Sequence, residues 1–292
     1  MEKIKFITDS ASDIPVELAQ KYNIQVLPIP ITIDGKGYLE RQDFTPSQFY
    51  QMVLDAESIP TTSHIPHTRY AEVYRHAALD GYTHVINITI NAKGSNMYNA
   101  AVMGIDLFRE DEPELAENLK ITVIDSQSYT YTYGYAVVQG AKMAEEGKRF
   151  DEILEWIEDY FSRVETYFAV LNLDFAKKSG RISAAAAFVG EVLGLRPIMT
   201  VSGGEIRILE KVRGDRNVIP KMLQIATDRR KGEKSPFIVM HTMHPEHGRE
   251  LEKGLVKACG KYCAGDFEIG ASITINAGPT AFGCIVMGEK RE

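Results

Sequence analysis

The sequence has few cysteines, no excess of positive charge and no long apolar run, and each shortage excludes a class of protein. Three cysteines, Cys259, Cys263 and Cys284, cannot form a disulfide framework, and no second cysteine pair is present to complete a structural zinc site. The 33 Lys and Arg against 40 Asp and Glu give a net charge of −7, which argues against a nucleic-acid partner. No apolar run reaches the roughly 18 residues of a membrane span. We therefore expect a cytoplasmic protein with no integral membrane segment.

Common signatures of enzymes are also missing. The chain has no G-x-G-x-x-G after a strand, no P-loop, no G-x-S-x-G and no H-E-x-x-H. His241, His244 and His247 are evenly spaced, but the first ends a predicted strand and the others begin a helix, so their rings need not converge. We expect neither a metal nor a cofactor. The missing motifs also argue against a nucleotide-binding protein or a hydrolase.

The length predicts two domains, with a boundary near residue 150. The 292 residues, 44% hydrophobic, suffice for two cores, and the charged, glycine-containing stretch 145–149 marks the change between them. In residues 1–150 strands alternate with helices, a pattern typical of a parallel sheet with crossover helices, as in a Rossmann-like α/β domain. The expected strands are Ile4–Thr8, Ile24–Ile33, His84–Ile90 and Lys120–Ile124, and helices are expected after Pro15, after Thr45, near Pro66 and over Met97–Arg109.

Residues 151–292 predict a second domain of mixed α/β type. Gly203 and Gly204 separate two extended runs and predict a β-hairpin, because a two-residue turn there needs positive φ angles. An alanine-rich helix is expected over Ser183–Leu195. The expected strands are Tyr167–Leu173, Pro197–Val201, Glu205–Val212, Phe237–His241, Glu268–Ile275 and Cys284–Met287.

Polar residues follow the predicted parallel strands, at the sheet edge where such folds bind ligands. Asp9 and Asp125 lie there, and each could be an acid–base group or a cap of the next helix. Ser95 precedes the Met97 helix as its expected N-cap, where the helix dipole favours an anion. The run Thr61–Ser63 adds three hydroxyls. Hydroxyls without a cluster of Lys and Arg suit one carboxylate better than a polyphosphate; a cap without a ligand is the alternative.

Several segments in order resemble the DegV family, and the resemblance spans nearly the whole chain. They are FITDSASDIP from Phe6, TSHIP from Thr62, KGSNMYNAA from Lys93, VIDS from Val123, SGRIS from Ser179, VRGD from Val212 and AGP from Ala277. The resemblance implies a DegV domain over about residues 4–288, with two α/β domains and a long-chain fatty acid, such as palmitate (hexadecanoate), in the crevice between them. It further implies a bacterial fatty-acid-binding subunit that presents its ligand to the catalytic subunit of a fatty acid kinase.

The resemblance also assigns residues. Thr62, Ser63 and Ser95 match family positions that bind the carboxylate, and Arg181 lies near the head group or on the kinase-docking face. Asn276 stands where the family often has a histidine, and it can form hydrogen bonds but does not titrate near neutral pH. Met97 replaces a frequent threonine, and the tyrosines at 129, 131, 133 and 135 replace smaller residues.

Our interpretation is therefore a lipid-binding carrier without intrinsic catalysis. Two alternatives stay open at this point. One is a small-molecule enzyme that uses Asp9 or Asp125 at the sheet edge, and the other is a regulator that responds to an acyl ligand. A polar pocket with a perturbed carboxylate would favour the enzyme.

Overall fold

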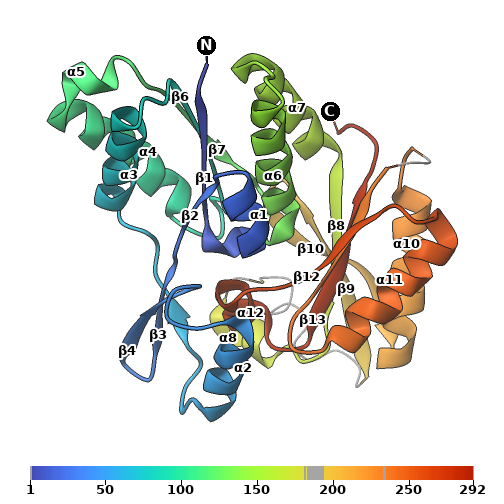
Figure 1. The fold of residues 1–292 in the computed structure, drawn as a ribbon. Coiled ribbons are helices and arrows are strands. Elements are labelled where there is room, and N and C mark those ends of the chain that lie inside the picture. The colour runs from blue at the N-terminus through green and yellow to red at the C-terminus, as the bar shows by residue number, and fades with distance from the viewer. Residues whose placement is uncertain (1, 181, 183–193, 233–234, 292) are drawn as a thin grey trace. The chain divides into compact units, whose positions relative to one another are not determined.

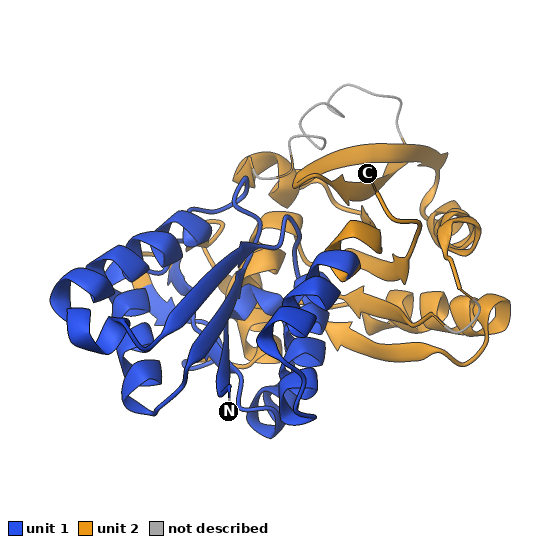
Figure 2. Cartoon of the chain, turned by 90° about the horizontal axis from the view of Figure 1, so that it is seen from above, with its two compact units in different colours: residues 1–32, 37–43, 62–159 blue, residues 33–36, 44–61, 160–292 orange. Residues whose placement is uncertain are grey.

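The computed structural model describes residues 2–180, 182, 194–232 and 235–291 (Figure 1). These residues fall into two compact units (Figure 2). Unit 1 consists of residues 1–32, 37–43 and 62–159, and unit 2 of residues 33–36, 44–61 and 160–292. The sequence analysis expected one boundary after residue 150, whereas the chain passes into unit 2 after Asp159 and also enters it twice earlier.

Helix α7 (Phe150–Arg163) explains why the boundary lies later than expected. Gly147 has a positive φ of 83° beyond the end of helix α6 (Tyr131–Glu145), and this glycine suggested the boundary. The first turn of α7 nevertheless belongs to unit 1. The Phe150 N–H donates to the Glu2 carboxylate at 2.7 Å, and the Phe150 ring lies 4.4 Å from the His84 ring.

Unit 1 is built on a four-stranded parallel sheet of order β2-β1-β6-β7. Its strands are β1 (Ile4–Asp9), β2 (Gln25–Leu27), β6 (His84–Thr89) and β7 (Lys120–Asp125). The predicted parallel α/β architecture is confirmed. All four strands end at one edge, so the polar residues that follow β1, β6 and β7 are brought to the same side of the sheet.

Helices cover both faces of this sheet (Figure 2). Phe6 faces α6, because a Cβ on Gly140 of that helix would lie 2.7 Å from the Phe6 ring. Asn87 faces the other side, where its amide donates to the Tyr74 hydroxyl at 2.8 Å. The remaining helices of the unit are η1 (Ser10–Ser12), α1 (Val16–Lys21), α3 (His67–Leu79), α4 (Met97–Asp111) and α5 (Pro113–Ala116).

A separate small sheet of three short strands has the order β4-β3-β5. Its strands are β4 (Lys36–Leu39), β3 (Pro30–Ile33) and β5 (Thr61–Thr62). The extended run predicted over residues 24–33 is therefore two strands, since residues 28 and 29 separate β2 from β3. Helix α2 (Pro46–Asp55) begins as predicted, with Thr45 and Gln48 forming a capping box.

Unit 2 contains a six-stranded mixed sheet of order β10-β9-β8-β13-β11-β12. Only the β11–β12 pair is parallel among its five pairings. The strands are β8 (Val164–Val170), β9 (Leu195–Ser202), β10 (Glu205–Arg213), β11 (Phe237–His241), β12 (Cys263–Glu268) and β13 (Ala281–Met287). The predicted hairpin is confirmed: β9 and β10 are antiparallel, and Gly203 and Gly204 turn between them with φ angles of 56° and 74°.

Each face of the unit 2 sheet packs its own core. Alternating strand residues such as Tyr167 and Phe237 pack with α10 (Val218–Arg229, after η2, Asp215–Asn217) and α11 (Pro245–Cys259). On the other face, Val170 and Met199 pack with Ala176 of α8 (Asp174–Ser179) and Ala277 of α12 (Ala271–Ala277). The helix expected over Ser183–Leu195 lies largely outside the described residues, which resume at Gly194 with β9 beginning at Leu195.

One strand prediction was wrong. Residues 268–275, of which three are isoleucine, were expected to be extended, but β12 ends at Glu268 and α12 begins at Ala271. Buried positions 271, 272, 274 and 275 have the spacing of a helix face, and α12 packs on α8 and α2. Tertiary packing outweighed β propensity here.

Because α3 and α4 approach closely at Gly104, we expect that adding one methyl group there destabilises the protein. A Cβ on Gly104 would lie 2.6 Å from the Tyr70 Cβ and 2.9 Å from the His67 carbonyl oxygen. Gly104→Ala should lower the free energy of unfolding in urea by about 1–3 kcal/mol, although alanine is the better helix former. Met103→Ala, at an exposed position of α4, should change it by less than about 0.5 kcal/mol. A Gly104→Ala variant as stable as the wild type would contradict this account.

Candidate functional site

Asp9 ties together three elements at the carboxyl edge of the unit 1 sheet. Its carboxylate accepts hydrogen bonds from the N–H of Ala11 at 3.2 Å, the N–H of Ile90 at 2.9 Å and the hydroxyl of Tyr133 at 2.6 Å. The side chain is fully buried, and burial raises the pKa of Asp9 to about 6. The three protein donors occupy this carboxylate, so it acts as the N-cap of η1 and as an anchor of the loop after β6.

Asp125 anchors that same loop from the neighbouring strand. Its Oδ1 accepts from the N–H of Ala92 and from the N–H of Gln127, each at 2.9 Å. Like Asp9, it binds backbone amides of the loops at this edge. Of the two readings left open by the sequence, capping and bracing of backbone is the one that the geometry of both carboxylates supports.

The loop of residues 91–96 folds around Asn91, which is fully buried. The Asn91 carbonyl oxygen accepts from the N–H of Gly94 at 3.0 Å and from the N–H of Ser95 at 3.1 Å. Its side-chain oxygen accepts from the N–H of Lys93 at 3.2 Å, and its side-chain nitrogen donates to the Tyr129 hydroxyl at 2.6 Å. The loop is thus a compact turn with a defined backbone path.

Ser95 lies at the end of this turn, one residue before the helix cap. The N-cap of α4 is Asn96, which makes no side-chain cap hydrogen bond, so the prediction of Ser95 as N-cap was wrong by one residue. The helix itself begins at Met97, as predicted. Ser95 is partly exposed, and among the described residues its hydroxyl has no recorded hydrogen-bond partner. A hydroxyl beside the first N–H groups of a 15-residue helix suits an anionic group.

Thr62 and Ser63 lie on a segment that is fixed next to the start of α4. The Ser63 N–H donates to the Pro30 carbonyl oxygen at 3.0 Å. Two residues later, the Ile65 N–H donates to the Met97 sulfur at 3.5 Å. Thr62 is partly exposed and Ser63 exposed, so both hydroxyls remain accessible. The Ile65 N–H therefore ties the segment after Ser63 to the first residue of α4, the helix that follows Ser95.

Of the other two predicted site residues, one belongs to unit 2 and one lies outside the described residues. Asn276 lies on α12 of unit 2, where its side-chain nitrogen donates to the Ser272 carbonyl oxygen at 2.7 Å. Its own carbonyl oxygen accepts from the Ser179 hydroxyl at 3.3 Å. Arg181 lies outside the described residues. The roles expected for Asn276 and Arg181 stay predictions.

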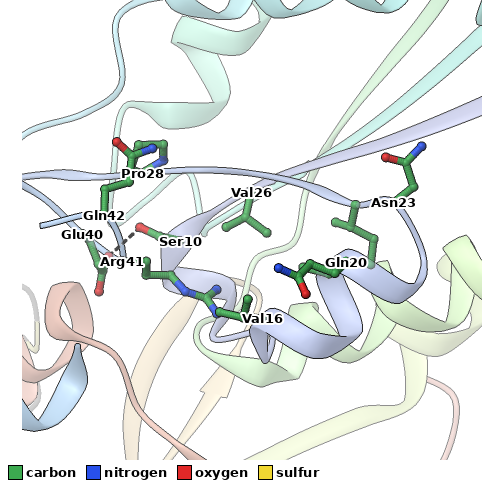
Figure 3. Close-up of a pocket in the computed structure, with 11 residues that line it drawn as sticks. Ser10, Val16, Gln20, Asn23, Val26, Pro28, Glu40, Arg41 and Gln42 are labelled. Atoms are coloured by element: carbon green, nitrogen blue, oxygen red, sulfur yellow. Dashed lines mark hydrogen bonds between the residues drawn. The ribbon is translucent and has the colours of Figure 1, made fainter. Parts of the chain in front are cut away.

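A pocket of about 390 Å³ opens on unit 1 beside α1 (Figure 3). At its base the Ser10 hydroxyl donates to the buried Glu40 carboxylate at 2.5 Å and accepts from the Ile29 N–H at 3.0 Å. Ile29 precedes Pro30, whose carbonyl oxygen holds Ser63. The hydrogen bonds of Ser10 therefore fix Ile29, the residue before the one that accepts the Ser63 N–H. The lining residues are Ser10, Val16, Ala19, Gln20, Asn23, Ile24, Val26, Pro28, Glu40, Arg41 and Gln42.

The evenly spaced histidines of unit 2 have different carboxylate partners, although the His244 and His247 ring centroids lie 5.8 Å apart. His241 Nε2 lies 3.5 Å from an Asp266 carboxylate oxygen, whereas His244 Nδ1 lies 2.9 Å from Glu246. Over the described ranges, no group of three or more His, Cys, Asp or Glu residues is arranged to hold a metal ion. In those same ranges no helix combines the length and apolarity of a membrane span.

Two residues important for the site geometry were not assigned a role from the sequence. Met97 is buried, and its sulfur accepts hydrogen bonds from Ile65 and, at 3.7 Å, from the Tyr70 hydroxyl. Tyr129 supports Asn91. Both were noted as departures from the family pattern, and this was the available signal in the sequence. Only the fold shows that Met97 contacts Ile65 and that Tyr129 contacts Asn91 of the loop.

A comparison with family models identifies a match over nearly the whole chain. The model of the DegV family, described as a family of uncharacterised proteins, matches residues 3–289. A DegV domain-containing protein of Caldanaerobacter subterraneus is 31% identical over 287 residues, which cover 97% of this chain and 98% of the relative. The match therefore includes both units.

Solved structures of the same fold include proteins described as binding fatty acids. A stearic-acid-binding protein from Eubacterium ventriosum superposes with a TM-score of 0.88 at 27% identity, covering 99% of this chain and 98% of that one. A fatty-acid-binding DegV family protein from Thermus thermophilus superposes with a TM-score of 0.86 at 26% identity, covering 98% and 100%. Their similarity confirms the two-domain α/β fold class.

The raised pKa of Asp9 predicts how stability depends on pH. Because the folded state holds this proton up to about pH 6 and an exposed aspartate releases it near 3.8, the group's contribution is present below pH 3.8 and is lost as the pH rises through 6. The loss amounts to at most about 3 kcal/mol. In urea titrations from pH 4 to 7, the free energy of unfolding of the wild type should fall relative to that of Asp9→Asn. A pH-independent difference in stability between the wild type and Asp9→Asn would contradict the assignment.

The turn also predicts the effect of filling Gly94. A Cβ there would lie 2.7 Å from the Tyr129 hydroxyl oxygen and 3.3 Å from its Cζ. Gly94→Ala should therefore destabilise the protein by about 1–3 kcal/mol in urea unfolding. Adding Tyr129→Phe removes the nearest atom, so the double variant should lose less stability than the sum of the two single variants. Strict additivity would show that Tyr129 and Gly94 do not compete for this space.

Proposed function

The chain belongs to the DegV family, and on that premise we propose that it is a carrier that binds one long-chain fatty acid by its carboxylate and shields the acyl chain. The observation that supports the proposal is the hydrogen bond from the Ile65 N–H to the Met97 sulfur, which holds the segment after Thr62 and Ser63 at the start of α4, beside Ser95. The fatty-acid ligands of the Eubacterium and Thermus proteins, which share this fold, support the same ligand class.

We assign the carboxylate to the hydroxyls of Thr62, Ser63 and Ser95. Serine and threonine hydroxyls can each donate one hydrogen bond to a carboxylate oxygen, and a charged acceptor makes such bonds short and strong. The unpaired N–H groups of the first turn of α4 add a favourable potential for the negative charge. Asn276 and Arg181 are further candidates for the head group, proposed on the family pattern alone.

The acyl chain supplies most of the binding free energy in this proposal. A 16-carbon chain such as that of palmitate transfers about 15 methylene and methyl groups out of water, which is worth about 12 kcal/mol before any cost. Ordering the chain and fixing its orientation consume part of that gain. The tail therefore sets affinity, and the hydroxyls set the orientation of the carboxyl group.

We further propose that the oriented carboxyl group is presented to a separate kinase, which converts it to an acyl phosphate in the cytoplasm. On this view the chain has no catalysis of its own. The two aspartates considered for an enzyme support this division of roles, because Asp9 and Asp125 bind backbone N–H groups of the loops. Palmitate is the proposed first ligand to test.

The test is direct binding of palmitate to the delipidated full-length chain. In native mass spectrometry and in titrations, the wild type should bind one palmitate. Thr62→Ala/Ser95→Ala removes two donors to a charged acceptor and should weaken binding by about 10- to 100-fold, at roughly 1 kcal/mol or more per bond. Thr68→Ala, an exposed hydroxyl on α3, is the matched control and should leave binding unchanged.

Two results would argue against the proposal. Failure of the wild type to take up palmitate or another long-chain acid would remove the carrier function. Binding that survives the double substitution at full strength, in a protein with an unchanged melting temperature, would move the carboxylate away from these hydroxyls.

A further inference from the structure

We propose that Tyr129 is a positioning residue for the head-group site: its hydroxyl, acting through Asn91, fixes the direction of the Ser95 hydroxyl. The inference rests on the proposed function, since it concerns how tightly the carboxylate of the ligand is held. Tyr129 needs no contact with the ligand for this role, because it supports the turn that ends in Ser95.

The first part of the argument is the hydrogen bond between Tyr129 and Asn91. The Asn91 side-chain amide donates to the Tyr129 hydroxyl at 2.6 Å, and Asn91 is fully buried. This bond orients the planar amide, and the opposite atom of that amide accepts the Lys93 N–H. The main chain of Asn91 then holds the N–H groups of Gly94 and Ser95. One tyrosine hydroxyl is thereby connected to every residue of the turn from 93 to 95.

The second part is steric. The Tyr129 ring lies directly under Gly94, so close that an added Cβ would meet its hydroxyl oxygen at 2.7 Å and its Cε1 at 3.2 Å. The hydrogen bond sets the orientation of the turn, and the ring contact prevents the Gly94 backbone from moving closer to Tyr129. Together they hold the turn from two directions.

The segment that carries Tyr129 is itself well anchored. Ser128, the residue before it, accepts the Asn91 N–H at 3.1 Å and makes a second bond to the Ser126 hydroxyl. Thr130, the residue after it, has φ 56° and ψ −152°, a backbone region that side-chain-bearing residues rarely adopt. The sharp bend at Thr130 leads directly into α6 and fixes the direction from which the tyrosine meets the turn.

A small change in the turn should matter for the carboxylate because hydrogen bonds are directional. Their strength falls steeply when the donor angle departs from linear, and a charged acceptor makes each bond count for more. A loosened turn therefore weakens recognition of the carboxylate without touching the apolar contacts of the chain. This difference separates positioning from a general structural role.

The experiment compares palmitate with hexadecan-1-ol, which has the same chain and no carboxylate, in the delipidated full-length protein. Tyr129→Phe should weaken palmitate binding about three- to tenfold, the effect of one lost hydrogen bond, and leave binding of the alcohol unchanged. In a Ser95→Ala background, Tyr129→Phe should have no further effect on palmitate. Tyr82→Phe is the matched control, because Tyr82 also accepts a hydrogen bond from an asparagine, Asn23, at 2.8 Å, and it lies near the opposite edge of the sheet, just before β6.

The possible results separate the two proposals. If the wild type binds palmitate but Tyr129→Phe weakens acid and alcohol equally, or still weakens the acid in the Ser95→Ala background, Tyr129 has no positioning role. If the wild type binds no long-chain acid, the proposed function fails first and this inference with it.

Hydrogen exchange of the protein without ligand provides a second readout. Loss of the Tyr129 hydroxyl should speed exchange of the Gly94 and Ser95 N–H groups, which bond to Asn91, and leave that of Ala100 in α4 unchanged. Unchanged protection of Gly94 and Ser95 would overturn the inference even if the binding experiment were obscured by poor folding of a double variant.

Discussion

The carboxyl edge of the unit 1 sheet depends on the buried carboxylate of Asp9. A parallel sheet brings its strand ends together, but it does not fix the loops that follow them. Asp9 does so by accepting backbone and hydroxyl donors from three elements: η1, the end of β6 and helix α6. The cost is visible in its raised pKa, because the negative charge has been taken out of water. A loop that starts at Ile90 from a fixed point can hold the Ser95 hydroxyl in one position.

In the proposed function, the anion is recognised by hydroxyls and helix N–H groups. This choice suits a carboxylate whose other end is a long apolar chain. Because the chain supplies most of the favourable free energy, the head-group site needs to orient the ligand more than to hold it strongly. Hydroxyls that orient the carboxylate without enclosing it would suit the proposed role of presenting the carboxyl group to a kinase.

The sequence predicted the parts of the fold that local signals control. The capping box at Thr45 and the Gly203–Gly204 hairpin depend on neighbouring residues, and the parallel sheet of unit 1 follows from the alternation of strands and helices. All three are confirmed. Helix α12 was missed because its two isoleucines and one threonine favour a strand, whereas its packing against α8 and α2 favours a helix. The boundary was placed early because Gly147 ends a helix, while the contacts of Phe150 with Glu2 and His84 arise from residues far apart in sequence. For the site, the hydroxyls were visible in the motifs, but the register of the cap depended on a turn formed by Asn91.

The departures from the family pattern acquire a physical meaning in this fold. Met97 and Tyr129 replace smaller or more polar residues, and each side chain supports a segment that carries a proposed ligand hydroxyl: Met97 through the Ile65 N–H, Tyr129 through Asn91. The hydroxyls themselves, at Thr62, Ser63 and Ser95, are the residues that the family motif expects. The chain therefore differs from the pattern in residues that support the proposed site and at Asn276, whereas the three proposed ligand hydroxyls agree with it. The hydroxyls determine which ligand is recognised, and the supporting side chains determine how the hydroxyls are oriented. The changes at Met97 and Tyr129 should therefore preserve the class of ligand and alter how firmly its carboxylate is oriented.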